Sequence, residues 1–276
     1  MVSQLWHISI GKVILTLLLV AASIACVRVV AHKELSEVEV GLAVLQEDRV
    51  RRLIFGPEIQ GYVATYPLFA EVINTEIVSD LGGYLDRYNV HASERLTYPE
   101  TGLSEVDPFL LRATKVTATV RVGIRLMNYV GLRLQQLAAM NSVAKNSKEI
   151  LYTMTPEELS LSVQRVRNAK GMLNAEQKRE IAKDIVVLVA DMEAVYEAAE
   201  QAKGLQLEGE NLQRSLGSSA YAAELQNRDA SRAKLLPEIL SNLNGTLAGL
   251  RNAASDGEAL VRNARMWKVT LADAMQ

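Results

Sequence analysis

The sequence is poor in the residue types that most often mark disulfides, metal sites and turns. Its 276 residues include 1 cysteine, 3 histidines and 6 prolines, and aromatic side chains make up 5% of the chain. A single cysteine excludes an intramolecular disulfide. The chain is nevertheless 49% hydrophobic, so its core must consist mainly of aliphatic side chains, and the scarcity of proline favours long helices. We therefore predict an all-α fold.

Neither sign of charge is in excess. The 30 lysines and arginines nearly balance the 32 aspartates and glutamates, which leaves a formal net charge of −2. Nucleic-acid binding draws most of its affinity from basic residues that neutralise phosphates, and this composition supplies no such overall positive field. Nucleic acid is therefore not an expected partner.

Sequence motifs for catalysis, cofactor binding or metal binding are also missing. His7, His32 and His91 share no predicted helical face with a cysteine or carboxylate at ligand spacing, so no metal site is expected. His91 and Glu94 lie three residues apart in "HASE", but a solvated loop is the more common explanation of such a pair. We expect no enzyme activity, no catalytic residue and no cofactor.

The longest uncharged run lies near the N-terminus. Residues 13–27 contain no charge, and Lys12 and Arg28 flank them. A helix over residues 8–31 would cross the hydrocarbon core of a bilayer if the two flanking cations reached the headgroups. We predict that residues 1–33 form a retained membrane anchor. Its apolar residues are Val13, Ile14, Leu15, Leu17, Leu18, Leu19, Val20, Ile24, Cys26 and Val27.

Two other interpretations of this run remain open. Lys12, the apolar core and the small residues at 29–31 are typical of a cleaved secretion signal, with His32 as the mature start. The sequence Ser23-Ile24-Ala25-Cys26 partly matches a lipid-attachment site at Cys26. A retained anchor is favoured because Arg28 interrupts the end of the run and the segment before it is long for a signal.

The anchor predicts a single-pass membrane protein, and a bacterial-type inner membrane fits it best. Because short N-terminal tails usually leave the rest of the chain across the membrane, we expect the large C-terminal part on the outward, periplasmic side. The basic residues that follow the run favour the cytoplasmic side instead, by the positive-inside rule.

Between the anchor and residue 153, apolar spacing predicts helices and one long loop. Residues 34–56 are expected to form a helical stalk that ends at Gly56-Pro57. Residues 57–153 are expected to form a helical subdomain, with a helix that begins near Pro67. The polar stretch at 89–107 predicts a long loop within this subdomain. One face of the helix that follows Pro67 carries Phe69, Val72, Ile73, Ile77 and Leu81.

Residues 116–137 fit two periods at once. Their apolar residues fall at helical spacing after Asp107, but residues 116–126 also alternate apolar and polar side chains as a half-buried strand does. We favour a helix because the neighbouring segments are helical. A soluble strand pair and a hairpin that inserts into membranes are the alternatives.

Residues 154–276 are expected to form a helical bundle with coiled-coil-like seams. Asn174 should cap a helix that ends at Gly204, and Gly257 should break the last long helix. Apolar residues at alternating steps of four and three define two seams for helix packing or for a partner. They are Ile181, Ile185, Leu188, Met192 and Val195 in the first, and Leu236, Leu240, Leu243, Leu247 and Leu250 in the second.

These features favour a structural or interaction component, a scaffold subunit of a membrane-associated protein assembly. Its expected partners are the membrane and other protein subunits, further copies of the same chain included. The alternatives are a membrane-active or pore-forming effector, in which residues 116–137 insert, and a helical ligand-sensing domain. A sensor of the usual transmembrane kind would need a second span, and the sequence offers none.

Overall fold

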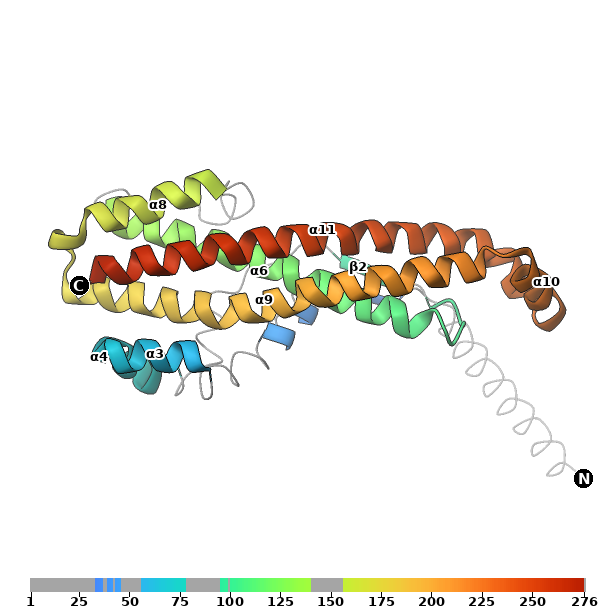
Figure 1. The fold of residues 1–276 in the computed structure, drawn as a ribbon, viewed down its shortest axis with the longest axis horizontal. Helices are drawn as coiled ribbons and strands as arrows, with labels where there is room; N and C mark the ends of the chain where they lie inside the picture. The colour runs from blue at the N-terminus through green and yellow to red at the C-terminus, as the bar shows by residue number, and fades with distance from the viewer. Residues whose placement is uncertain are drawn as a thin grey trace, which may run out of the picture.

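Three long helices lie side by side and form an elongated rod (Figure 1). The computed structural model describes residues 33–36, 39–41, 43–45, 56–77, 95–98, 100–139 and 156–275. The long helices are α6 (Asp107–Ala139), α9 (Ala175–Leu216) and α11 (Ala230–Met275). With 46 residues, α11 is roughly 70 Å long at the α-helical rise per residue. The predictions of an all-α fold and a helical bundle are confirmed.

The shorter elements lie mainly at the two ends of the rod. At one end, α8 (Pro156–Asn168) packs beside α6 and α11, while α3 and α4 lie against α9 (Figure 1). At the other end, α10 turns the chain from α9 into α11. The remaining bounds are α3 (Pro57–Thr65), α4 (Pro67–Val72), the π-helical η1 (Ile73–Ile77), the 3-10 turn η2 (Lys170–Met172) and α10 (Ser219–Arg228).

A two-stranded antiparallel ladder corrects two sequence predictions. Strand β1 (Lys33–Ser36) pairs with β2 (Arg95–Tyr98), with Lys33 opposite Tyr98 and Ser36 opposite Arg95. The predicted stalk helix is therefore wrong at residues 34–36, and the predicted loop at 89–107 contains a strand. Backbone pairing between segments about sixty residues apart decides this structure, and the local apolar spacing carries no signal of it.

The rest of the predicted stalk packs on the bundle where the structure describes it. Residues 39–41 and 43–45 are helical, and Leu45 is buried in the main apolar cluster. A Cβ added to Gly41 would lie 2.9 Å from the carbonyl oxygen of Ala118 in α6. Such a close approach of two helical backbones needs a glycine. This segment is therefore part of the fold and not a free stalk.

The segment with two periods is helical. Residues 116–137 lie within α6, and Val116, Val120, Val122 and Leu126 are all buried. Because α6 contacts α8, α9 and α11, it buries more than one face. A helix enclosed by neighbours does not need a strict amphipathic period, and this explains why its sequence also alternates like a strand.

Helices α9 and α11 both continue through a glycine at which the sequence predicts an end or a break. The predicted cap of α9 is confirmed: Asn174 Oδ1 accepts a hydrogen bond from the Gln177 backbone N–H at 2.8 Å, and Gln177 Oε1 accepts one from the Asn174 backbone N–H at 2.9 Å. However, α9 passes Gly204 and ends at Leu216, and α11 passes Gly257. Packing against the neighbouring helices stabilises α9 and α11 enough to outweigh the intrinsic cost of a single glycine in each.

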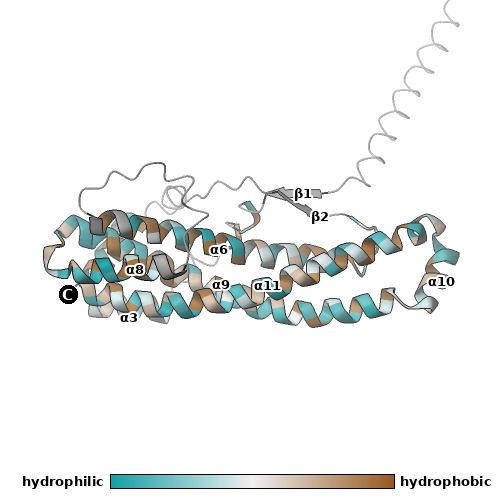
Figure 2. Cartoon of the chain, turned by 90° about the horizontal axis from the view of Figure 1, so that it is seen from above, coloured by the Kyte–Doolittle hydropathy of each residue, from teal (hydrophilic) through white to brown (hydrophobic). Residues whose placement is uncertain are grey.

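Hydrophobic and hydrophilic residues alternate along each long helix (Figure 2), and the buried apolar ones join the helices to one another. Two clusters of buried residues divide the core along the rod. The first joins α4, η1, α6, α8, the first half of α9 and the end of α11. The second joins the start of α6, the second half of α9, α10 and the first half of α11. The rod is thus stabilised along its whole length by contacts between residues distant in sequence.

The predicted membrane anchor lies outside the described residues, apart from Lys33 at its end. The same holds for Cys26 and for both alternative cleavage sites. Among the helices that the structure does describe, none combines the length and the apolarity that crossing a bilayer requires.

Candidate functional site

Both predicted seams lie inside the bundle. The first-seam residues Ile181, Ile185, Leu188, Met192 and Val195 are all buried, in the cluster that joins α9 to α6 and α11. In the second seam, Leu236, Leu243, Leu247 and Leu250 are buried and Leu240 is partly buried. These residues hold the helices together in the folded chain. A surface for a partner has to be sought on the outer faces.

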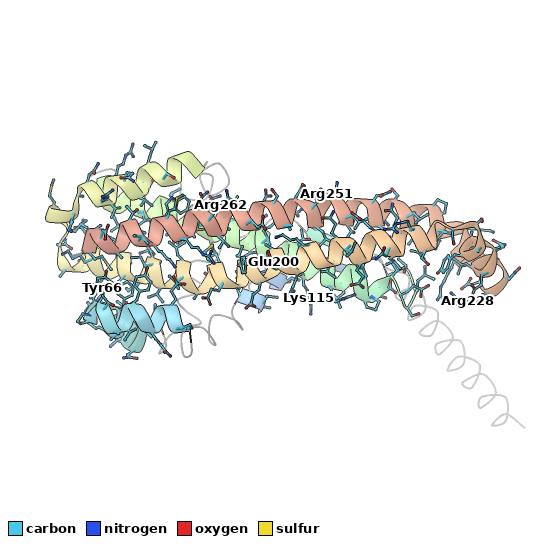
Figure 3. The ribbon with its side chains drawn as sticks, in the orientation of Figure 1. Tyr66, Lys115, Glu200, Arg228, Arg251 and Arg262 are labelled. Carbon is cyan, nitrogen blue, oxygen red and sulfur yellow. The ribbon has the colours of Figure 1, made fainter. Side chains whose placement is uncertain are left out.

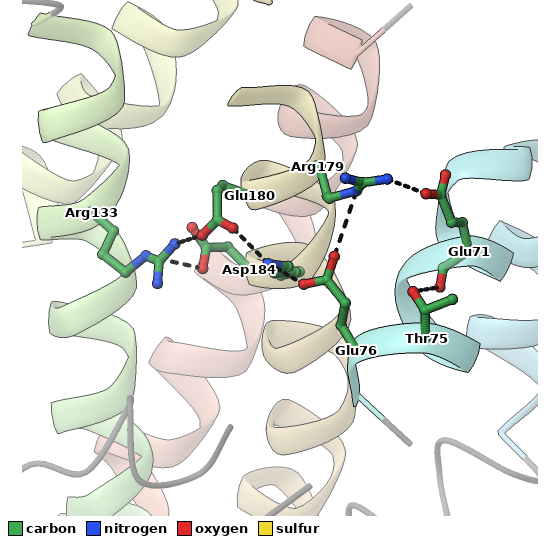
Figure 4. Close-up of polar contacts among 8 residues, drawn as sticks. Glu71, Thr75, Glu76, Arg133, Arg179, Glu180 and Asp184 are labelled. Atoms are coloured by element: carbon green, nitrogen blue, oxygen red, sulfur yellow. Dashed lines mark hydrogen bonds and ion pairs between the residues drawn. The ribbon is translucent and has the colours of Figure 1, made fainter. Parts of the chain in front are cut away.

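A network of charged side chains connects α6 with α9 (Figure 4). The Arg133 guanidinium donates a hydrogen bond to Glu180, and its Nε lies 3.5 Å from Oδ1 of the fully buried Asp184. Lys183, itself buried, donates to Glu180 at 2.6 Å. Buried charges are tolerated in a core only when they are paired in this way. The network therefore fixes how α6 and α9 face each other at this end.

The same network extends to the α4–η1 segment (Figure 4). Lys183 forms an ion pair with Glu76 of η1, and Arg179 forms one with Glu71 of α4. Arg179 Nε also lies 3.5 Å from the Glu76 carboxylate. Ion pairs thus attach α4 and η1 to α9, in addition to the buried residues Phe69, Val72, Ile73 and Ile77 that their sequence pattern predicts.

This pairing shifts the pKa values of Glu180 and Lys183 in opposite directions. Burial alone would raise the pKa of Glu180, but hydrogen bonds from Lys183 and Arg133 outweigh it and hold the pKa below its ordinary 4.5. Burial alone would lower the pKa of Lys183, but its hydrogen bonds to Glu180 and Glu76 hold the pKa above 10.5. Glu180 and Lys183 are therefore both charged at neutral pH. The stability that they contribute is lost on acidification through Glu180, or at strongly alkaline pH through Lys183.

Removing one carboxylate from this network should reduce stability in a pH-dependent way. We expect Glu180→Gln to lower the free energy of unfolding by about 1–2 kcal/mol at neutral pH, because Arg133 and Lys183 lose their charged acceptor. The difference from the unchanged protein should shrink as the pH falls below 4.5, because the unfolded carboxyl then takes up a proton that the folded carboxylate does not. Urea unfolding at several pH values measures it. The exposed Glu224→Gln on α10 is the control, and an equal loss at every pH would contradict the expectation.

The face formed by α9 and α11 carries cross-helix polar contacts along its length. In Figure 1, α6 lies behind these two helices, which leaves their common front face on the outside of the rod. The contacts are the Arg265 guanidinium over the Tyr196 ring at 5.7 Å, the Lys203–Glu258 ion pair, the Arg251–Glu210 pair at 4.0 Å and the Gln213–Asn244 hydrogen bond at 2.6 Å. They fix which residues of the two antiparallel helices lie at the same height.

A groove of about 200 Å³ opens on this face. Its floor is apolar and includes Leu188, Met192 and Val261, while Glu193 and Glu197 of α9 and Arg265 and Lys268 of α11 line it as well. Lys268 also forms an ion pair with Glu58 of α3, which closes one end. The groove thus combines an apolar floor with carboxylates on one helix and cations on the other.

A wider groove, of about 600 Å³, lies between α6 and α9 beside Val44. Arg112 and Glu208 line it and form an ion pair with each other at 2.5 Å. Over the part of the chain that the structure describes, no three histidine, cysteine or acidic side chains gather closely enough to hold a metal ion. The two grooves instead combine charged side chains with apolar ones.

The sequence did not lead us to predict the charged residues of the network between α6, α9 and η1, nor those of the groove on the α9–α11 face. The α9 carboxylates were visible in principle, since Glu193, Glu197 and Glu200 recur at steps of four and three beside the first seam. On α11, the cations Arg262, Arg265 and Lys268 recur at steps of three. The pairing of Lys183 with Glu76 had no such signal, because only the fold brings η1 against α9.

Comparison with known proteins gives no match. No family model matches the chain, and neither a curated protein nor a solved structure is significantly similar to it.

Proposed function

We propose that this chain is a membrane-anchored helical interaction component, a scaffold subunit of a membrane-associated protein assembly. The observation that carries the proposal is the long outer face of α9 and α11. These helices have 42 and 46 residues. Cross-helix contacts between charged, polar and aromatic side chains follow their common face from Tyr196 to Gln213. A long surface of this kind suits contact with other proteins better than the turnover of a small substrate.

Exposed apolar side chains on this face support a role in binding. Tyr196 of α9 is 43% exposed and Met266 of α11 is 56% exposed, and both line the same shallow pocket. Arg265 stacks on the Tyr196 ring among them. Tyrosine, methionine and arginine are enriched in protein interfaces, and neighbouring exposed apolar residues with a charged rim are typical of such sites.

The membrane part of the proposal is supported by the sequence. The uncharged residues 13–27 and their flanking cations provide a span of sufficient length immediately before the folded part of the chain. An anchor would concentrate the rod at a membrane surface, where even modest contacts between subunits become effective because the local concentration is high.

Membrane fractionation tests the anchor. We expect the full chain to remain in the pellet after an alkaline wash of the membranes. The double variant Leu17→Asp and Leu18→Asp should release most of it, because each aspartate near the centre of a span costs about 2.5–3.5 kcal/mol. Leu161→Asp, on an exposed position of α8, is the matched control and should stay in the pellet. Release of the unchanged chain by the wash would overturn the anchor.

A further inference from the structure

Two arginines of α11 have no ion-pair partner among the residues that the structure describes. Arg262 and Arg265 are both exposed, and neither lies in ion-pair range of a described carboxylate. Glu258, one turn before Arg262, forms its ion pair with Lys203 of α9. The hydrogen bond from Lys203 is the main cause that lowers the pKa of Glu258, and Arg262 adds only a weaker effect of its charge. Both guanidinium groups are therefore available to an external anion.

Both guanidinium groups line a shallow pocket of about 410 Å³ between α9 and α11. Its apolar lining consists of Val261, Met266 and the ring of Tyr196. Arg265 lies over this ring, with 5.7 Å between the guanidinium carbon and the ring centroid. The stacking restrains the arginine without neutralising its charge. An oriented cation and exposed apolar surface thus lie side by side.

The pocket continues into the groove of about 200 Å³ on the same face. The two share Tyr196, Val261 and Arg265, so they form one trough. Along α11 the trough extends from Glu258 to Lys268, which is about 15 Å at the α-helical rise and matches a helix of about three turns. A small molecule is usually enclosed in a deeper cavity, whereas an open trough of this length fits a helix that lies along the rod.

We propose that this trough binds an acidic amphipathic helix of a partner protein. Arg262 and Arg265 lie one turn apart on α11, so they can pair with two carboxylates one turn apart on a helix beside them. Arginine binds a carboxylate through two parallel hydrogen bonds, which makes each contact both strong and selective. Apolar side chains of the same partner helix cover Met266 and the Tyr196 ring. This docking site rests on the proposed function, because a scaffold requires a protein to hold.

The carboxylates of this face determine where the acidic residues of the partner lie. Glu258 is already paired with Lys203. Glu193 and Glu197 line the narrower groove but not the pocket that contains both arginines. The partner helix should therefore carry its carboxylates over the Arg262 end of the trough, and uncharged or basic residues over the end that contains Glu193.

Two labelled helical peptides test the site by fluorescence anisotropy with the full chain in detergent. Both carry the same row of leucines, and they differ at two positions one turn apart, which are glutamate in the first peptide and lysine in the second. Micelles without protein give the baseline. The unchanged chain should bind the glutamate peptide at least ~10-fold more tightly, because its carboxylates pair with Arg262 and Arg265. The variant Arg262→Gln with Arg265→Gln should lose this preference, and Arg262→Glu with Arg265→Glu should reverse it.

The reversed preference separates the contact from a loss of folding, because a misfolded chain would not gain affinity for the lysine peptide. The matched control, Arg228→Gln with Arg251→Gln, removes the same charge from exposed positions closer to the α10 end of the rod (Figure 3) and should keep the preference. Equal affinity of the unchanged chain for both peptides, or a preference that survives the loss of Arg262 and Arg265, would overturn the proposal.

An anionic membrane is the other surface that exposed arginines could contact. The full chain in phosphatidylcholine vesicles should not tether phosphatidylserine vesicles through these residues. Tethering that requires Arg262 and Arg265, without a preference between the peptides, would overturn the proposal and assign the arginines to lipid. A chain that lacks the preference but stays in the alkaline-washed pellet would overturn the docking site alone. A chain that shows the preference but washes off would overturn the anchor alone.

Discussion

Replacing Leu188 with aspartate should lower the free energy of unfolding by several kcal/mol. Leu188 is 3% exposed and belongs to the cluster that joins α9 to α6 and α11. The substitution removes the aliphatic contacts of a core leucine and places a charged carboxylate at a buried position. The two effects together amount to about 3–5 kcal/mol, which is a large part of the total stability of a typical domain.

Chemical denaturation followed by circular dichroism measures this change. The control is Leu161→Asp, because Leu161 of α8 is 57% exposed and the same chemical change there should alter stability by no more than about 0.5 kcal/mol. Equal stability of Leu188→Asp and the unchanged protein would show that the first seam is not buried in solution.

Substitution of Gly257 with alanine should destabilise the rod by about 1–3 kcal/mol. A Cβ added at Gly257 of α11 would lie 2.7 Å from the Cβ of Ala199 of α9, and neither atom can move without moving its helix. The two longest helices would have to separate along the middle of the rod. The sequence alone gives the opposite expectation, because a glycine that merely weakens a helix is improved by alanine.

Gly245 provides the matched control in the same helix. No atom lies within 4 Å of a Cβ added there, so Gly245→Ala should stabilise the chain by about 0.5–1 kcal/mol through helix propensity alone. Thermal unfolding of both variants gives two shifts of opposite sign. A stabilising Gly257→Ala would contradict the close packing of α9 on α11.

Fold class could be predicted from the sequence because it depends on local patterns. The spacing of Ile181, Ile185 and Leu188 and the cap at Asn174 are both read within a few residues. Such patterns fix helices and their buried faces. The same reasoning failed at Gly204 and Gly257, where tertiary packing outweighs the local preference for a break.

Features that depend on distant parts of the chain could not be predicted. The β1–β2 ladder joins residue 33 to residue 98, and the Lys183–Glu76 pair joins α9 to η1. Periodicity carries no information about such pairings. The charged residues around the groove are intermediate: Glu193 and Glu197 are regularly spaced in the sequence, but only the packing of α9 against α11 places them beside Arg265 and Lys268.

The central claim, that a retained anchor holds a rod for protein contacts at a membrane, is tested most directly by the intact mass of the protein recovered from alkaline-washed membranes. We expect the mass of the full chain, with residues 13–27 still attached to the folded rod. A mass that corresponds to a chain beginning at His32, or at a lipid-modified Cys26, would contradict the retained helical anchor.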